Sequence, residues 1–117
     1  MKRLGKYTLE FHRPPSLLAQ AAVGGKKEAE GPLGKDFDQT FQDTTLQEDS
    51  WEKAEAQLQK EAVSLVLGKA GVRPQQVVYL FAGDLLNQCI SSTFGLMDFG
   101  IPFLGQYGAC STMAQTL

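Results

Sequence analysis

Cys110 has the surroundings that most strongly suggest chemistry. It lies in the segment Gly108–Thr112, directly after an apolar run, and the residues that follow it, Met113–Gln115, favour a helix. Near the start of a helix, exposed amides carry partial positive charge, which favours the thiolate and can hold an oxyanion. The pattern therefore predicts either an acyl-accepting nucleophile or an anion contact at Cys110. Ser111 and Thr112 would add hydroxyl donors. The alternative is a small apolar cysteine packed beneath the sheet.

A second polar group follows the preceding apolar run. Asp84, Asn87 and Gln88 come just after Val77–Ala82, and the ligands of open α/β sheets gather at the carboxyl ends of strands. These side chains are therefore predicted to lie near Cys110 and to supply polar contacts there. The simpler interpretation of Asp84 is that it caps the helix that follows.

Other kinds of site have little support. His12 is the only histidine, and it is expected to be exposed on the polar side of a terminal strand, while Cys89 lies in a helical pattern and is expected in the core. The two cysteines form neither a metal-ligand pair nor a redox pair, so free thiols and no metal site are predicted. No glycine array of the nucleotide-binding kind occurs, so no cofactor is predicted. A net charge of −2 and a pI near 5.3 argue against nucleic acid as a partner.

The elements that must position these residues follow the order strand, helix, strand, helix, strand. Alternating apolar and polar residues predict a half-buried strand over residues 6–11. Apolar residues at three- and four-residue spacing predict a helix over 50–68. Unbroken apolar runs predict strands covered on both faces at 77–82 and 103–108, with a helix over 87–98 between them. This is the order of right-handed βαβ units in an α/β fold, with a mixed or parallel sheet and covering helices.

The boundaries of the long helix carry their own signals. Asp49 and Glu52 have the spacing of a capping box, and Gly71 followed by Pro74 predicts the end of the helix. The chain between Gly24 and Glu48 is predicted to be irregular, and connections of that length usually have a packing or binding role. The predicted buried face of the long helix comprises Ala54, Leu58, Ala62, Leu65 and Val66. One side of the later helix carries Ile90, Phe94 and Met97.

The sequence also predicts a location. No segment reaches the roughly 18 apolar residues of a membrane-spanning helix. Lys6, Thr8, Glu10 and His12 interrupt any apolar core of a signal peptide after the basic N-terminus. We therefore expect the protein to be intracellular when it is made.

The glycine-containing turns resemble those of thiolase-fold proteins. The residues that carry this likeness are Gly83–Leu86, Gly100–Pro102 and Gly108–Ser111. In thiolases and ketoacyl synthases the cysteine of the last turn accepts the acyl group, so the resemblance implies that Cys110 occupies the nucleophile position. Thr112 and Met113 are larger than the residues that follow the thiolase cysteine, which leaves less room for a pantetheine-linked acyl chain.

Four longer blocks resemble the stage V sporulation protein AD family of spore-forming bacteria. They are Gly31–Asp38, Trp51–Glu55, Ala82–Gln88 and Ile101–Thr112. The resemblance implies a thiolase-like fold, and members of that family are much longer than this chain. Residues 1–117 are therefore expected to be the N-terminal portion of a thiolase-like domain whose second half is absent.

The resemblance also implies a function. It implies a non-catalytic component that binds dipicolinic acid, either free or as its calcium chelate, and works with membrane proteins of the same operon to load it into the forespore. The implied location is the cytoplasm or the forespore, peripheral to the spore inner membrane. The expected ligand-binding residues are Cys110, Ser111, Thr112, Asp84 and Asn87.

Two alternatives remain open at this point. One is a fragment of a thiolase- or ketoacyl-synthase-type acyltransferase with Cys110 as nucleophile, and the other is a small α/β interaction module with a structural Cys110. Because a parallel sheet needs both faces covered, the isolated chain is also expected to be marginally stable or to associate, for example as a homodimer.

Overall fold

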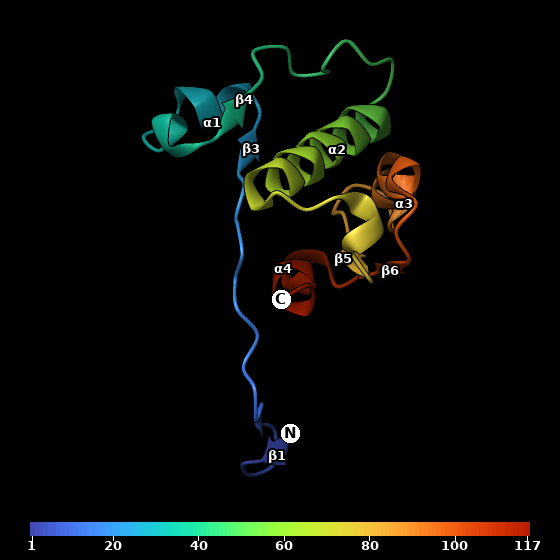
Figure 1. Cartoon of the computed structure of the whole chain (residues 1–117). Helices are drawn as coiled ribbons and strands as arrows, with labels where there is room; N and C mark the ends of the chain where they lie inside the picture. Colours follow the sequence, from blue (N-terminus) through green and yellow to red (C-terminus); the bar gives the residue numbers. More distant parts are fainter.

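The computed structural model describes all residues from 1 to 117 and is a mixed α/β structure. Its strands form three separate two-stranded sheets (Figure 1). One sheet is antiparallel and joins β1 (Lys2–Arg3) to β2 (Leu9–Glu10). The other two are parallel, and they join β3 (Val23–Gly24) to β4 (Gln39–Thr40) and β5 (Leu80–Ala82) to β6 (Phe103–Gly105). The predicted α/β fold class is confirmed.

The helices differ greatly in length. They are α1 (Lys26–Glu30), α2 (Trp51–Ala70), α3 (Ile90–Leu96) and α4 (Thr112–Gln115). Short 3₁₀ turns occur at Gly34–Asp36, Pro74–Gln76, Met97–Phe99 and Ala109–Ser111. Helix α2 runs through the middle of the molecule, and α3 packs along it (Figure 1). No helix in the chain is long and apolar enough to cross a membrane.

The N-cap of helix α2 lies one residue after the predicted one. The Ser50 hydroxyl accepts a hydrogen bond from the backbone N–H of Lys53 at 3.3 Å, so Ser50 is the N-cap. The predicted capping box of Asp49 and Glu52 is therefore wrong, and Asp49 instead forms an ion pair with Lys53 Nζ at 2.7 Å. The predicted end is confirmed, because Gly71 takes the left-handed conformation (φ 64°) that terminates a helix with least strain.

Helix α3 packs against α2 through small residues. Its buried residues are Ser91, Ser92, Gly95 and Leu96. A Cβ atom added at Gly95 would lie 2.9 Å from the Cα of Ala56 on α2, so only glycine permits this separation of the two backbones. The predicted apolar side, which carries Ile90 and Phe94 of α3 and Met97 of the following turn, is exposed.

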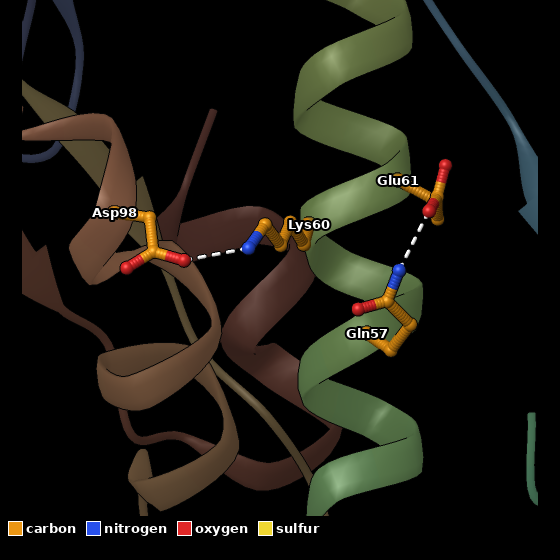
Figure 2. Close-up of polar contacts among 4 residues, drawn as sticks. All are labelled: Gln57, Lys60, Glu61 and Asp98. Atoms are coloured by element: carbon orange, nitrogen blue, oxygen red, sulfur yellow. Dashed lines mark hydrogen bonds and ion pairs between the residues drawn. The ribbon is translucent and has the colours of Figure 1, made fainter. Parts of the chain in front are cut away.

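An ion pair joins α2 to the turn that follows α3. Lys60 Nζ on α2 lies 2.6 Å from Asp98 Oδ2 in the 3₁₀ turn after α3 (Figure 2). On α2 itself, Gln57 Nε2 donates a hydrogen bond to Glu61 Oε1 at 2.6 Å.

The N-terminal arm, which we define as residues 1–22, extends away from the body of the molecule (Figure 1). Residues 1–18 are all exposed, and Tyr7 is 86% exposed. The predicted half-buried strand over 6–11 is therefore wrong: only Leu9–Glu10 is a strand, and it pairs with β1 rather than joining β5. The arm raises the radius of gyration to 15.8 Å, compared with about 13 Å for a compact chain of this length.

The segment between Gly24 and Glu48 is more ordered than predicted. It contains α1, a 3₁₀ turn and β4. Asp38 ties it to the rest of the molecule by accepting hydrogen bonds from Lys69 Nζ on α2 at 2.7 Å and from the backbone N–H of Ala22 at 2.9 Å. These two donors lower the pKa of Asp38.

The hydrophobic core is small. Nine of the 117 residues are buried, and the buried hydrophobic ones are Ala54, Leu96 and Ile101. Strand β5 is shorter than the predicted 77–82 strand and is not covered on both faces, because Phe81 is 47% exposed. Strand β6 likewise spans three residues of the predicted 103–108.

Candidate functional site

Cys110 lies in the middle of the 3₁₀ turn Ala109–Ser111, which leads directly into α4. Its side chain is exposed and its thiol is free. Ala109 has φ 49°, a left-handed conformation that residues other than glycine adopt at a cost. The turn therefore presents Cys110 just before a helix, as the sequence predicted, and the conformation of Ala109 adds strain there.

A cavity of about 540 Å³ opens beside this turn. Residues of α2, the carboxyl end of β5 and the 109–113 segment form its walls, which are predominantly apolar and include Phe81. Cys110, Thr112 and Asp84 all line it, so the structure brings these three predicted site residues together. The volume is within the range of small-molecule sites.

Gly83 allows the chain after β5 and the chain after β6 to lie close together beside this cavity. A Cβ atom at position 83 would overlap the carbonyl oxygen of Gln106 and crowd the methyl group of Thr112. The strand ends are also joined by a hydrogen bond from Gln106 N to Ala82 O at 2.8 Å. Thr112 is buried and its hydroxyl accepts from Gly108 N at 3.2 Å, which holds the Cys110 turn in shape.

Asp84 is the buried acid of the site. It is 3% exposed, and its carboxylate accepts hydrogen bonds at 3.1–3.2 Å from the backbone N–H groups of Asn87, Cys89 and Ser92 and from the Ser92 hydroxyl. Burial acts to raise the pKa of Asp84, but these hydrogen bonds outweigh it and hold the pKa below its usual range. Asp84 therefore organises the start of α3, which agrees with the capping interpretation.

The other predicted residues lie outside the cavity lining. Asn87 is exposed and contributes its backbone N–H to Asp84. Ser111 is exposed and its hydroxyl donates to Gly108 O at 2.7 Å. Gln88 is exposed in a left-handed conformation (φ 48°). Cys89, expected in the core, is half-buried and its thiol donates to Gln106 O at 3.3 Å.

Glu55 on α2 is a lining residue that sequence reasoning missed. Burial raises its pKa, and the negative charge of Asp84 raises it further, while the Ser91 hydroxyl and the Leu85 backbone act in the opposite direction. The available signal was its position directly after Ala54, the buried residue of the helical pattern.

The electrostatic character of the cavity follows from these side chains. Its lining holds two carboxyl groups, those of Glu55 and Asp84, and no lysine, arginine or histidine. His12 lies on the N-terminal arm, outside the lining. An anion entering this cavity therefore meets no compensating cation.

Comparison with known proteins identifies close relatives. Residues 5–117 match the family model described as Stage V sporulation protein AD (SpoVAD). The Stage V sporulation protein AD of Bacillus subtilis (strain 168) is 39% identical over 117 residues, which are 100% of this chain and 35% of that protein. The chain therefore spans about a third of the length of this relative.

Proposed function

This chain belongs to the stage V sporulation protein AD family, and we propose that its Cys110 cavity binds dipicolinic acid as the calcium chelate, without making a covalent bond. The family match and the similar protein confirm the family relationship that the four sequence blocks predicted. The family is named for a stage of sporulation and not for a reaction. The observation that carries the proposal is the charge of the cavity: two carboxyl groups and no basic side chain.

This charge distribution favours the chelate over the free ligand. Dipicolinate carries two carboxylates at neutral pH, and placing them beside Asp84 in a partly dehydrated cavity is unfavourable. Ca²⁺ prefers oxygen ligands, including carboxylates, and it neutralises the charge of the ligand. The apolar lining, including Phe81 and Leu58, then suits the aromatic ring.

Cys110 contacts the ligand in this proposal but does not attack it. A cysteine nucleophile is commonly activated by an adjacent base, usually histidine. The only histidine of the chain, His12, does not line the cavity. In this proposal, Thr112 and Cys110 contribute to the site through the shape that they give to its wall.

The proposal extends to the cellular role. We propose that the protein passes the chelate to membrane proteins encoded in the same operon, and that it acts in the cytoplasm or forespore at the surface of the spore inner membrane. The assignment of the family to sporulation supports this role.

Isothermal titration calorimetry tests the ligand assignment. We expect calcium dipicolinate to bind, and dipicolinate with excess EDTA to bind at least about tenfold more weakly. Two substitutions at one exposed position separate shape from thiol chemistry: Cys110→Ala should change affinity less than about threefold, whereas Cys110→Trp should abolish binding by filling the cavity.

Three outcomes would contradict the proposal. Tighter binding of free dipicolinate would remove the electrostatic argument, and absence of binding by the folded wild-type chain would remove the site. A covalent adduct on Cys110 formed with an acyl-coenzyme A, detected by mass spectrometry and lost in Cys110→Ala, would favour the acyltransferase alternative.

A further inference from the structure

Two polar atoms in the contact between α2 and α3 are buried without a hydrogen-bond partner. They are Glu55 Oε2 on α2 and Ser91 Oγ on α3, and Ser91 is only 1% exposed. The Ser91 hydroxyl lies close enough to the Glu55 carboxyl to influence its ionisation. Folded proteins contain few such atoms, because each one loses its hydrogen bonds to water without replacement.

The Glu55 carboxyl forms no ion pair. Two lysines of α1, Lys26 and Lys27, line a cavity that Glu55 also lines, and Lys26 pairs with Glu30. The charged residues that act on it are Asp84, from the turn before α3, and Glu52, from α2 itself, and both are acidic. Neither α3 nor β3, the elements packed against α2, contains a charged residue. The three lysines of α2 are paired with acids elsewhere: Lys53 with Asp49, Lys60 with Asp98 and Lys69 with Asp38 (Figure 2 shows the second pair).

We propose that Glu55 is a titratable positioning residue whose neutral form holds α2 against α3. The Ser91 hydroxyl can donate to the Glu55 carboxyl in either ionisation state and so satisfy both orphan atoms, but only the protonated carboxyl does so without placing a charge in the contact. An ionised Glu55 instead places an unpaired charge beside Asp84, which weakens the helix contact. This inference rests on the geometry of the contact, and it deepens the proposed function because Glu55 also lines the Cys110 cavity.

Glu55 is placed to affect two cavities at once. A second cavity, of about 740 Å³, lies between α1 and α2. Glu55, Leu58 and Leu85 line both cavities and thus form their shared wall. Ionisation of Glu55 therefore alters the wall that α2 contributes to the proposed ligand site.

The direction of the pH dependence follows from the raised pKa of Glu55. The contribution of this group to stability is complete below the unfolded-state pKa of glutamate and is lost as the pH rises through the higher folded-state pKa. Asp84, Asp38, Asp43 and Asp49 have lowered pKa values, so their contributions are lost at acid pH. Among the groups with shifted pKa values, Glu55 alone acts just above pH 4.5, the ordinary value for its side chain.

Trp51, the only tryptophan and the first residue of α2, provides a fluorescence probe for the test. Urea unfolding of the whole chain would be followed from about pH 4.5 upward for the wild type, Glu55→Gln and Glu61→Gln. We expect the unfolding equilibrium constant of the wild type to rise up to about tenfold per pH unit until the raised pKa is passed. Glu55→Gln should remove this rise, and Glu61→Gln, a control on the same helix, should retain it. Parallel profiles for wild type and Glu55→Gln would overturn the proposal.

A second measurement uses the wild type alone and does not depend on the folding of a variant. The backbone amide resonance of Ser91 should titrate in NMR spectra with a midpoint above pH 4.5, the ordinary value for Glu55. A midpoint at the ordinary value would overturn the proposal. No ligand is present in either measurement. A negative result for Glu55 is therefore distinguishable from a failure of the chain to bind calcium dipicolinate.

Discussion

The α2–α3 contact and the N-terminal arm show opposite relations between sequence pattern and burial. The arm alternates apolar and polar residues, yet Tyr7 and Leu9 are exposed. Helix α3 buries Ser91 and Ser92 and exposes Phe94, whose side chain is 66% exposed. Burial in this chain therefore follows the close approach of backbones and the pairing of polar groups more than it follows the hydrophobic period.

The difference has a physical cause. Gly95 lets α3 approach the backbone of α2, and Asp84 satisfies the amides at the start of α3. Two-stranded hairpins such as β1–β2 are at best marginally stable when they pack against nothing. A closely packed contact thus forms where small residues meet, while residues 1–18 of the patterned arm are all exposed.

Removing the Asp84 carboxylate should have a large effect on this contact. Asp84→Ala leaves the Ser92 N–H and hydroxyl and the Cys89 N–H without their acceptor. We expect a loss of about 3 kcal/mol in the free energy of unfolding, measured by urea with Trp51 fluorescence.

Asp98→Ala is the matched control for that prediction. Asp98 is 62% exposed at its side chain and forms one ion pair, with Lys60. Its loss should cost at most about 1 kcal/mol. Equal losses in the two variants would show that Asp84 does not organise the contact.

Two glycine substitutions should separate packing from helix propensity. Gly95→Ala places a methyl group against the Ala56 backbone and should destabilise the protein by about 1–3 kcal/mol. Gly68→Ala, on α2 with open space around it, should stabilise the protein by up to about 1 kcal/mol. Thermal unfolding followed by circular dichroism measures both. Stabilisation by both substitutions would mean that the close approach at Gly95 is absent in solution.

Much of the fold could be predicted because its signals are local. The period of α2 and its stop at Gly71 depend on neighbouring residues alone, and both were found. The length of β5 could not be predicted, because a strand extends only as far as its partner does: pairing begins where Leu80 N donates to Pro102 O at 2.9 Å. The pairing of β2 with β1 likewise depends on contacts that an alternating pattern does not specify.

The site, like the fold, could be predicted only where its signals are local in the sequence. The turn at Cys110 could be placed because the helix-forming residues that follow it are its neighbours in the sequence. The partial burial of Glu55, whose Oε2 atom is buried, could not be predicted, because it depends on the packing of α3 against α2, and the two helices are far apart in the sequence. A glutamate in a helical pattern is usually solvated.

The smallest effect is expected in the arm. Tyr7→Ser combined with Leu9→Ser removes two apolar side chains that are 86% and 58% exposed, so we expect the free energy of unfolding to change by less than about 0.5 kcal/mol. Leu96→Ala, which truncates an apolar side chain that is 3% exposed, should cost about 2–5 kcal/mol in the same urea assay. If the double substitution in the arm instead cost more than about 1 kcal/mol, the alternating face of the hairpin would have to be buried in solution. Sedimentation equilibrium would then distinguish an arm folded back on its own chain from one that packs on a second copy, because only the second gives a concentration-dependent mass. Either result would make the arm resemble the α2–α3 contact, and the contrast between the two regions would be lost.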